Sequence, residues 1–253
     1  MNILLLKKIK KYWLESINLQ RKHPQKLSFK KLCQLFSKWY ISQDPDKTPL
    51  TDQLPWITFP AIELLENFLT NDMKVFEYGS GGSTLFFARR VSEVVSVEHD
   101  KSWFNDVSKQ IEKHNYNNCT IYLIEPKTSD NSKLDEASLK QIASDPDAYT
   151  SLSLINQSFR GKNFVDYVRL IDRFPDNYFD VILIDGRSRP SCFKHSLKKV
   201  KKGGYLVWDN TDQEHYLSTV NTAVRGYSRL DLPGPTPYAD YFTITSLWCY
   251  ILD

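Results

Sequence analysis

The stretch Val75-Phe76-Glu77-Tyr78-Gly79-Ser80-Gly81-Gly82-Ser83-Thr84 is followed by Glu98, which lies 14 positions beyond its last residue. It begins as an apolar strand and runs into a glycine turn. A helix and a second strand, 93–98, are expected next, and that strand ends at Glu98. In such an α/β unit the turn lets a ligand approach the backbone, and the distal carboxylate accepts hydrogen bonds from ribose hydroxyls. The pattern therefore predicts a nucleotide-type ligand, and not only a turn between a buried strand and a helix.

Two features of the turn bear on which ligand it binds. Thr84 stands where a Gly-x-Gly-x-x-Gly pattern has its third glycine, which a pyrophosphate site usually needs. Glu77 precedes Gly79 by two residues, and Coulomb repulsion disfavours its charge beside a pyrophosphate. S-Adenosylmethionine has no phosphate and carries cationic sulfonium and ammonium groups, so a carboxylate beside the turn suits it. The sequence favours S-adenosylmethionine over NAD.

Four segments together resemble the class I S-adenosylmethionine-dependent methyltransferases, over about residues 56–250: 77–84, Glu98, 178–186 and 202–210. Their order and spacing carry the resemblance more than any single motif does. It implies an α/β fold with a doubly wound, mostly parallel seven-stranded sheet and a C-terminal antiparallel strand. It also implies a methyltransferase of the O-methyltransferase type. The candidate cofactor-binding residues are Glu77, Gly79, Ser80, Gly81, Ser83, Thr84, Glu98, Trp103, Glu125 and Asp185.

Helices and strands alternate along most of the chain, as they do in a parallel sheet covered on both faces. We expect a basic helical extension and connector over residues 1–55, and the cofactor-binding domain over residues 56–253. The polar segment 126–163 interrupts the alternation. Because long excursions at strand ends are more often functional than idle, we interpret it as part of the acceptor pocket or as a lid.

The C-terminal part of the chain is expected to close the sheet. A helix should run from Thr211 or Asp212 to Val224. Two antiparallel strands, 228–232 and 241–248, should follow, with a rigid proline-rich loop over 233–238 between them.

The first 40 residues carry a net charge of +9, whereas the rest of the chain carries −6. A basic arm of this kind can meet nucleic acid or an anionic membrane surface, or it can dock on its own acidic body. Apolar residues such as Ile9, Trp13 and Ile17 recur at helical spacing. We therefore expect packing helices near 3–20 and from the N-cap Ser28 to Tyr40, and we do not expect nucleic acid as a partner.

Composition limits the class of protein. Hydrophobic residues make up 41% of the chain, which is ordinary for a globular protein. No apolar run approaches the ~20 residues that span a bilayer, and the first apolar residues precede the lysines, the reverse of a secretory signal. The four cysteines are dispersed, which disfavours disulfides and a zinc site. These features predict a cytoplasmic enzyme with reduced thiols and a small-molecule acceptor, and they leave its oligomeric state open.

Methyl transfer to a hydroxyl requires loss of a proton, and therefore a general base or a metal ion. Asp185 ends the fourth predicted strand, and Asp209 and Asn210 end the fifth, so these side chains should converge. Their oxygen atoms suit Mg²⁺, and their spacing resembles the metal site of catechol-type O-methyltransferases. Alternatively, Asp185 orients the cofactor while Asp209 and Asn210 are turn or capping residues. Arg187 and Arg189 would repel a dication there, would clamp an anionic acceptor, or would form salt bridges with Asp185 or Asp209.

His195 is the second candidate for the base, because its ordinary pKa of about 6.5 suits proton transfer near neutral pH. We expect it early in a helix that Ser191 caps. A single histidine on a helix is more often structural or exposed, so both interpretations remain open. The candidate catalytic residues are thus Asp185, His195 and Asp209.

The most specific function that these residues predict is O-methylation of a small hydroxylated acceptor, sugar-like or phenolic. One alternative is an RNA methyltransferase that uses the basic arm. Against it, residues 185–188 do not match the Asn/Asp-Pro-Pro-Tyr/Phe tetrapeptide of amino-directed nucleic-acid enzymes. The other alternative is a non-catalytic partner protein with a cofactor fold, which would have no need of Glu77, Gly79 and Glu98.

Overall fold

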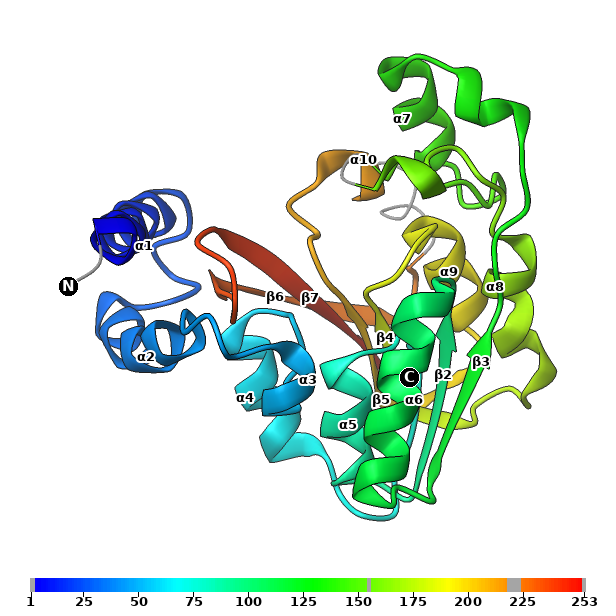
Figure 1. The fold of residues 1–253 in the computed structure, drawn as a ribbon, viewed down its shortest axis with the longest axis horizontal. Coiled ribbons are helices and arrows are strands. Elements are labelled where there is room, and N and C mark those ends of the chain that lie inside the picture. The colour runs from blue at the N-terminus through cyan, green and yellow to red at the C-terminus, as the bar shows by residue number, and fades with distance from the viewer. Residues whose placement is uncertain (1–2, 154–155, 218–223, 252–253) are drawn as a thin grey trace.

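The computed structural model describes residues 3–153, 156–217 and 224–251. At its centre lies a seven-stranded sheet in the order β3-β2-β1-β4-β5-β7-β6 (Figure 1). The first five strands are parallel, and β7 is antiparallel to both of its neighbours. The bounds are β1 Lys74–Tyr78, β2 Glu93–Glu98, β3 Cys119–Leu123, β4 Phe179–Ile184, β5 Val200–Trp208, β6 Tyr227–Pro235 and β7 Phe242–Tyr250. The predicted fold class is confirmed.

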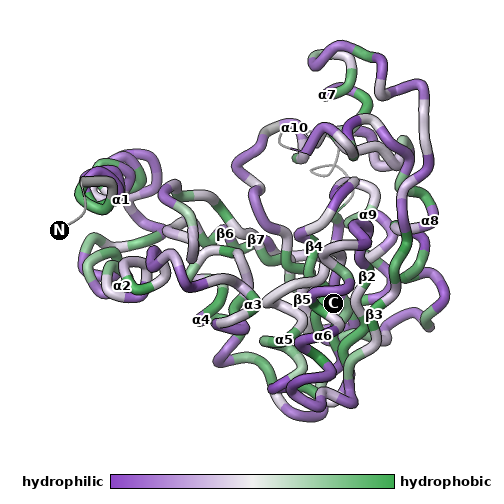
Figure 2. Tube along the Cα trace, in the orientation of Figure 1, coloured by the Kyte–Doolittle hydropathy of each residue, from purple (hydrophilic) through white to green (hydrophobic). Residues whose placement is uncertain are grey.

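Apolar residues fill both faces of the central strands, because successive side chains of a strand point to opposite faces. Val75 and Val181 pack in one core cluster with residues of α4 and α5. Phe76 and Ile182, each one residue further along, pack in a second cluster with residues of α8 and α9. The tube in Figure 2 accordingly runs green through the middle of the sheet. Burial on both faces leaves the strand ends as the place for polar side chains.

Helices accompany the strands in the expected alternation. Their bounds are α1 Ile3–Lys22, α2 Phe29–Ser42, α3 Pro49–Asp52, α4 Phe59–Phe68, α5 Gly82–Ala88, α6 Lys101–His114, α7 Glu136–Ser144, α8 Val165–Arg169, α9 Arg189–Ser196 and α10 Glu214–Leu217. Side chains cap several of them. Asp100 accepts hydrogen bonds from the backbone N–H groups of Ser102 and Trp103 at the start of α6. Ser28 accepts one from Lys31 and starts α2 as predicted.

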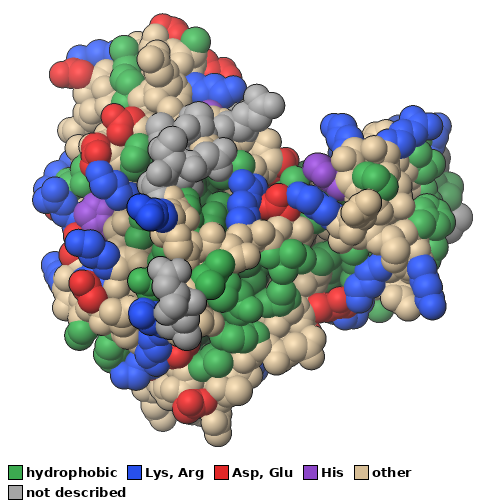
Figure 3. All heavy atoms as spheres, turned by 180° about the vertical axis from the view of Figure 1, so that it is seen from behind, with side chains coloured by type: hydrophobic (Ala, Val, Ile, Leu, Met, Phe, Trp, Pro, Cys, Tyr) green, Lys and Arg blue, Asp and Glu red, His purple; other side chains and the backbone are tan. Residues whose placement is uncertain are grey.

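The N-terminal arm is a helical hairpin, α1 and α2, that lies against the C-terminal strand pair. Tyr12 and Trp39 are fully buried within it, and the indole N–H of Trp39 donates to the carbonyl of Ala239 at 2.8 Å. Lys11 pairs with Asp240 at 3.0 Å. Seen from behind, the hairpin forms a lobe to one side of the body (Figure 3). These contacts are those of a packing element.

Segment 126–163 contains α7 and two short 3₁₀ turns, Asp130–Lys133 and Gln157–Phe159. Backbone bridges join Lys127 and Thr150 to Asn163, so its two ends are held together. In Figure 1, α7 stands above the sheet on the same side as α10.

Two local predictions are wrong, and a third falls partly outside the described residues. The loop predicted over 233–238 is in part strand, because β6 continues through Pro235, which pairs with Phe242. A strand accepts proline here since β6 is the edge of the sheet. Ser191 lies within α9, and Ser188 is its N-cap. The helix predicted to reach Val224 is described only as α10, and residues 218–223 lie outside the described residues.

None of the described helices is both long and apolar enough to cross a bilayer.

Candidate functional site

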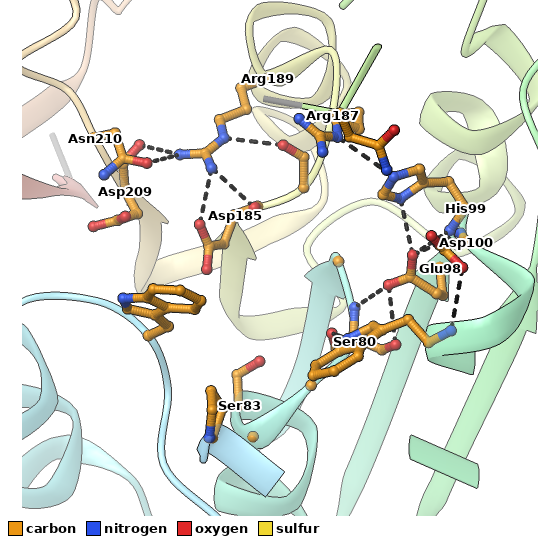
Figure 4. A pocket seen from close by; sticks show the side chains of 18 of the residues that line it. Ser80, Ser83, Glu98, His99, Asp100, Asp185, Arg187, Arg189, Asp209 and Asn210 are labelled. Atoms are coloured by element: carbon orange, nitrogen blue, oxygen red, sulfur yellow. Dashed lines mark hydrogen bonds and ion pairs between the residues drawn. The ribbon is translucent and has the colours of Figure 1, made fainter. Parts of the chain in front are cut away.

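A cavity of about 480 Å³ opens at the carboxyl ends of the parallel strands (Figure 4). It joins the glycine turn after β1 to the ends of β2, β4 and β5. Its lining includes Ser80, Gly81, Ser83, Glu98, His99, Trp103, Phe159, Asp185, Arg187, Arg189, Asp209, Asn210, Trp56, Thr236 and Tyr241. Ligands of open α/β sheets bind at this edge.

Two glycines of the turn are required by their surroundings. Gly79 has a φ of +94°, and a Cβ there would lie 3.0 Å from the Cα of Gly186 in the neighbouring loop. A Cβ on Gly82 would lie 2.2 Å from the carbonyl oxygen of Pro49 and 2.3 Å from that of Leu54. The connector after the arm is therefore pressed against the start of α5, and this contact closes the cavity on that side.

Glu77 is fully buried and does not line the cavity. Its carboxyl accepts a hydrogen bond from the Thr84 hydroxyl, which in turn accepts one from the backbone N–H of Gly81 at 2.9 Å. Its second oxygen has no partner among the described residues. Burial raises the pKa of Glu77 to about 7, against the lowering effect of its hydrogen bonds. Glu77 and Thr84 thus brace the glycine turn from beneath, whereas the sequence suggested that they face the ligand.

Glu98 is 2% exposed and lies at the floor of the cavity. One carboxylate oxygen accepts from the backbone N–H and the hydroxyl of Ser80 at 3.0 and 3.1 Å. The other accepts from the backbone N–H groups of His99 and Asp100 at 2.7 and 2.8 Å, and the His99 ring nitrogen Nδ1 lies 2.9 Å from it. Burial acts to raise the pKa of Glu98, but the contacts with His99 and Asp100 outweigh it and hold that pKa below its usual range. The carboxylate is therefore ionised and oriented.

Aromatic side chains flank Glu98. Trp103 is 36% exposed, and its indole N–H donates to the carbonyl of Ser80 at 2.6 Å. Phe159, from segment 126–163, lies with its ring centroid 4.5 Å from that of His99. The segment thus reaches the Glu98 end of the cavity. Glu125, which we expected beside the same ligand, is exposed and lies outside the cavity lining.

Arg189 occupies the centre of the group in which we expected a metal ion. Its guanidinium donates to the carboxylate of Asp185 at 3.0 Å and to the side-chain oxygen of Asn210 at 3.0 Å. It also donates to the backbone carbonyls of Gly186, Asp185 and Asp209. Because a fixed cation already satisfies these oxygens, the donor set does not fit the Mg²⁺ site expected at Asp185, Asp209 and Asn210. Among the residues described, no cluster of three or more His, Cys, Asp or Glu side chains could hold a metal.

Asp209 is 3% exposed and accepts a hydrogen bond from the hydroxyl of Thr245 at 2.5 Å. Burial raises its pKa, and the negative charge of Asp185 raises it further, while Arg189 opposes both. The side chain of Asp185 remains 24% exposed towards the cavity, and burial raises its pKa despite the charge of Arg189. The two carboxyls therefore form a coupled pair that holds a proton more readily than two separate carboxyls would.

The end of the cavity beside Asp209 is lined by residues from distant parts of the chain. Trp56, from the connector, and Tyr241, from the segment before β7, are each 45% exposed. Thr236 is 1% exposed, and its hydroxyl has no hydrogen-bond partner among the described residues. The hydroxyl oxygen is itself buried, so it would meet a ligand only after a local movement.

No protein-family model matches the chain, and no curated protein sequence matches it. Solved structures do match. A proposed O-methyltransferase from Klebsiella pneumoniae has a TM-score of 0.50 at 13% identity, over 97% of this chain and 100% of its own. The chain has the fold of the class I S-adenosylmethionine-dependent methyltransferases.

Two further structures with related folds are a Corynebacterium glutamicum protein and a Bacillus cereus O-methyltransferase. The first gives a TM-score of 0.51 at 8% identity, over 87% of this chain and 98% of its own. The second, solved with S-adenosylhomocysteine, gives 0.49 at 15% identity, over 84% and 98%. At these identities the likeness concerns the fold, so the roles of individual residues rest on the geometry.

His195 does not belong to the cavity of this methyltransferase fold. Its Nδ1 lies 2.9 Å from both carboxylate oxygens of Asp172, and its Nε2 lies 3.1 Å from the hydroxyl of Tyr149. It is absent from the cavity lining, so its partners hold it in a structural position on α9, where it contacts Tyr149 of segment 126–163. The expectation that His195 is the base loses its geometric support.

Several residues of the cavity lining belong to none of the sequence motifs. His99 follows Glu98 and could have been found by adjacency alone. Phe159, Thr236 and Tyr241 lie in segments without a motif, and only the folded chain brings them to the strand ends.

Proposed function

We propose that this protein binds S-adenosylmethionine in the cavity and methylates a hydroxyl group of a small acceptor. One observation carries the proposal: a single cavity joins an oriented Glu98 with a lowered pKa and a glycine turn at one end to the carboxyl pair Asp185 and Asp209 at the other. Its volume of about 480 Å³ lies within the usual range for small-molecule sites.

The Glu98 end fits a nucleoside. Its carboxylate would accept hydrogen bonds from ribose hydroxyls once the movable groups now beside it, the Ser80 hydroxyl and the His99 ring, turn away. Trp103 and Phe159 offer apolar surface for a flat base. The backbone of Gly79 and Gly81 leaves space for close approach of the remainder of the molecule. When bound, S-adenosylmethionine supplies the methyl group on a cationic sulfur.

The Asp209 end fits the acceptor. Trp56 and Tyr241 supply aromatic faces, while Asp185 and Asp209 supply carboxyl oxygens of the kind that a sugar-like or phenolic hydroxyl needs. Asp209 takes the proton of that hydroxyl as the oxygen–methyl bond forms and the sulfur–methyl bond breaks. Arg189 remains on Asp185 and opposes the rise in its pKa, whereas burial and Asp185 both raise the pKa of Asp209, so Asp209 is the more basic of the two.

Alignment supplies the rest of the catalysis. Holding donor and acceptor in line can contribute roughly 7–11 kcal/mol, so a proton acceptor and a dry, shaped cavity suffice without a Lewis acid. The acceptor is therefore a hydroxyl group, as predicted from the sequence, and Asp209 is the base that takes its proton.

Asp209→Asn tests the assignment, with His195→Ala as the matched control. Formation of S-adenosylhomocysteine would be measured against a panel of sugars and phenols. Removing a general base should lower kcat by about 10²–10⁴ while cofactor affinity stays unchanged. His195→Ala should keep its activity, because His195 lies outside the cavity. If His195→Ala loses activity while Asp209→Asn keeps it, His195 is the base and the role of Asp209 is refuted.

The pH profile gives a second readout of the same assignment. Because burial and Asp185 raise the pKa of Asp209, the rate should climb through neutral pH as that carboxyl loses its proton. A rate that is flat from pH 5 upwards would contradict a base with a raised pKa.

A further inference from the structure

The outer side of the α1–α2 hairpin exposes large apolar side chains. Leu6 and Ile17 on α1 are each 43% exposed, and Phe29 on α2 is 48% exposed. On the other side of α1, Tyr12 and Leu19 are buried against the body. Ile9 and Trp13 lie between these two sets and pack partly against the same core, so α1 has one broad apolar side whose outer edge is left exposed.

Aromatic rings make this surface continuous across both helices. The ring of Trp13 stacks on that of Phe36 at 5.2 Å between centroids and lies 5.9 Å from that of Phe29. Phe36 in turn lies 5.9 Å from Tyr40. We call the surface formed by Leu6, Trp13, Ile17, Phe29, Phe36 and Tyr40 the hairpin face.

Unpaired positive charge accompanies the hairpin face. The lysines that hold the hairpin to the body form ion pairs there: Lys11, Lys26, Lys31 and Lys38. Five other cations are exposed and form no ion pair within the described part of the chain: Lys7, Lys10, Arg21, Lys22 and Lys30. Glu15 is the single acid among the first 40 residues. Figure 3 shows hydrophobic atoms at the outer end of this lobe, with blue cations above and below them.

We propose that the hairpin face binds the surface of a membrane that contains anionic lipids. Its apolar side chains would enter the boundary between headgroups and acyl chains, and the unpaired cations would meet the anionic headgroups. A second copy of the chain fits less well, because a symmetric contact would bring the five unpaired cations of each copy together. RNA would use the cations but would gain nothing from Leu6 and Ile17.

Vesicle co-sedimentation of the full chain tests the proposal, with phosphatidylcholine vesicles compared with vesicles that also contain phosphatidylserine. The wild type should bind the anionic vesicles more tightly and release them as salt is raised. Lys10→Gln/Arg21→Gln/Lys30→Gln should weaken binding by about a hundredfold. Leu6→Ser/Ile17→Ser should also weaken it, at unchanged charge. The matched control, Lys113→Gln/Lys140→Gln/Lys202→Gln, removes three exposed lysines elsewhere and should bind like the wild type.

Circular dichroism would show that each variant keeps its fold. Equal binding to both vesicle types, or equal loss in the control variant, would overturn the proposal. Two other results would also overturn it: salt-sensitive binding of a transfer RNA with no vesicle binding, or a dimer that Leu6→Ser/Ile17→Ser dissociates and that leaves vesicles unbound.

Discussion

The guanidinium of Arg189 lies 3.0 Å from a carboxylate oxygen of Asp185, at the point where the strand ends converge. It satisfies the oxygens of Asp185 and Asn210 together, which a metal ion would otherwise have to do. The positive charge that stabilises this carboxylate pair therefore belongs to the chain itself.

Treatment with a chelator should consequently leave both cofactor binding and turnover unchanged. Loss of turnover that added Mg²⁺ restores would contradict the role given to Arg189.

Arg189→Met should destabilise the fold by about 3 kcal/mol, because it leaves buried carboxyls without their cation. Arg187→Met is the matched control: Arg187 lines the same cavity but forms no ion pair within the described part of the chain. Arg187→Met should lower the free energy of unfolding by much less. Urea unfolding measures the loss of stability in both variants. Equal losses would show that the contacts of Arg189 do not stabilise the fold more than those of Arg187.

Glu77 should make stability depend on pH. Its pKa rises from 4.5 to about 7 on folding, so the folded chain binds a proton more tightly than the unfolded chain between these values. Stability should therefore fall as pH rises through this interval, and Glu77→Gln should remove up to about 3 kcal/mol of that fall. Glu98→Gln should act in the opposite sense and lose stability at neutral pH, because the pKa of Glu98 is lowered. The free energy of unfolding of wild type and Glu77→Gln would be measured from pH 5 to 8. If it changes with pH in the same way for both, the pKa of Glu77 does not rise on folding.

The two glycines Gly81 and Gly82 should differ sharply although they are adjacent. Gly82→Ala should cost about 3 kcal/mol, because its Cβ would overlap backbone carbonyls of the connector. Gly81→Ala should leave the melting temperature almost unchanged, since its nearest neighbour would be Trp103 at 3.7 Å. Similar melting temperatures for the two variants would show that the connector does not press on α5.

Local patterns predicted the sheet well because they depend on neighbouring residues. The strands predicted over 74–78, 93–98 and 179–184 agree with the bounds of β1, β2 and β4, since each is an apolar run ending in a turn. The same patterns misplaced side chains at the site. Residue spacing placed Asp185, Asp209 and Asn210 together and left open a salt bridge from Arg187 or Arg189, but it could not decide that Arg189 reaches back between them. Nor could it show that Glu77 points beneath the turn, or that Thr236 and Tyr241 return to it from the C-terminal segment.

Calorimetric titration with S-adenosylmethionine tests the central claim most directly. We expect one molecule to bind per chain, and Glu98→Ala to weaken that binding by about 30-fold or more through loss of charged hydrogen bonds worth about 2 kcal/mol. His195→Ala, whose ring lies outside the cavity, should bind like the wild type. Failure of the wild type to bind S-adenosylmethionine, tight binding of NAD instead, or an unchanged affinity in a folded Glu98→Ala variant would contradict the account.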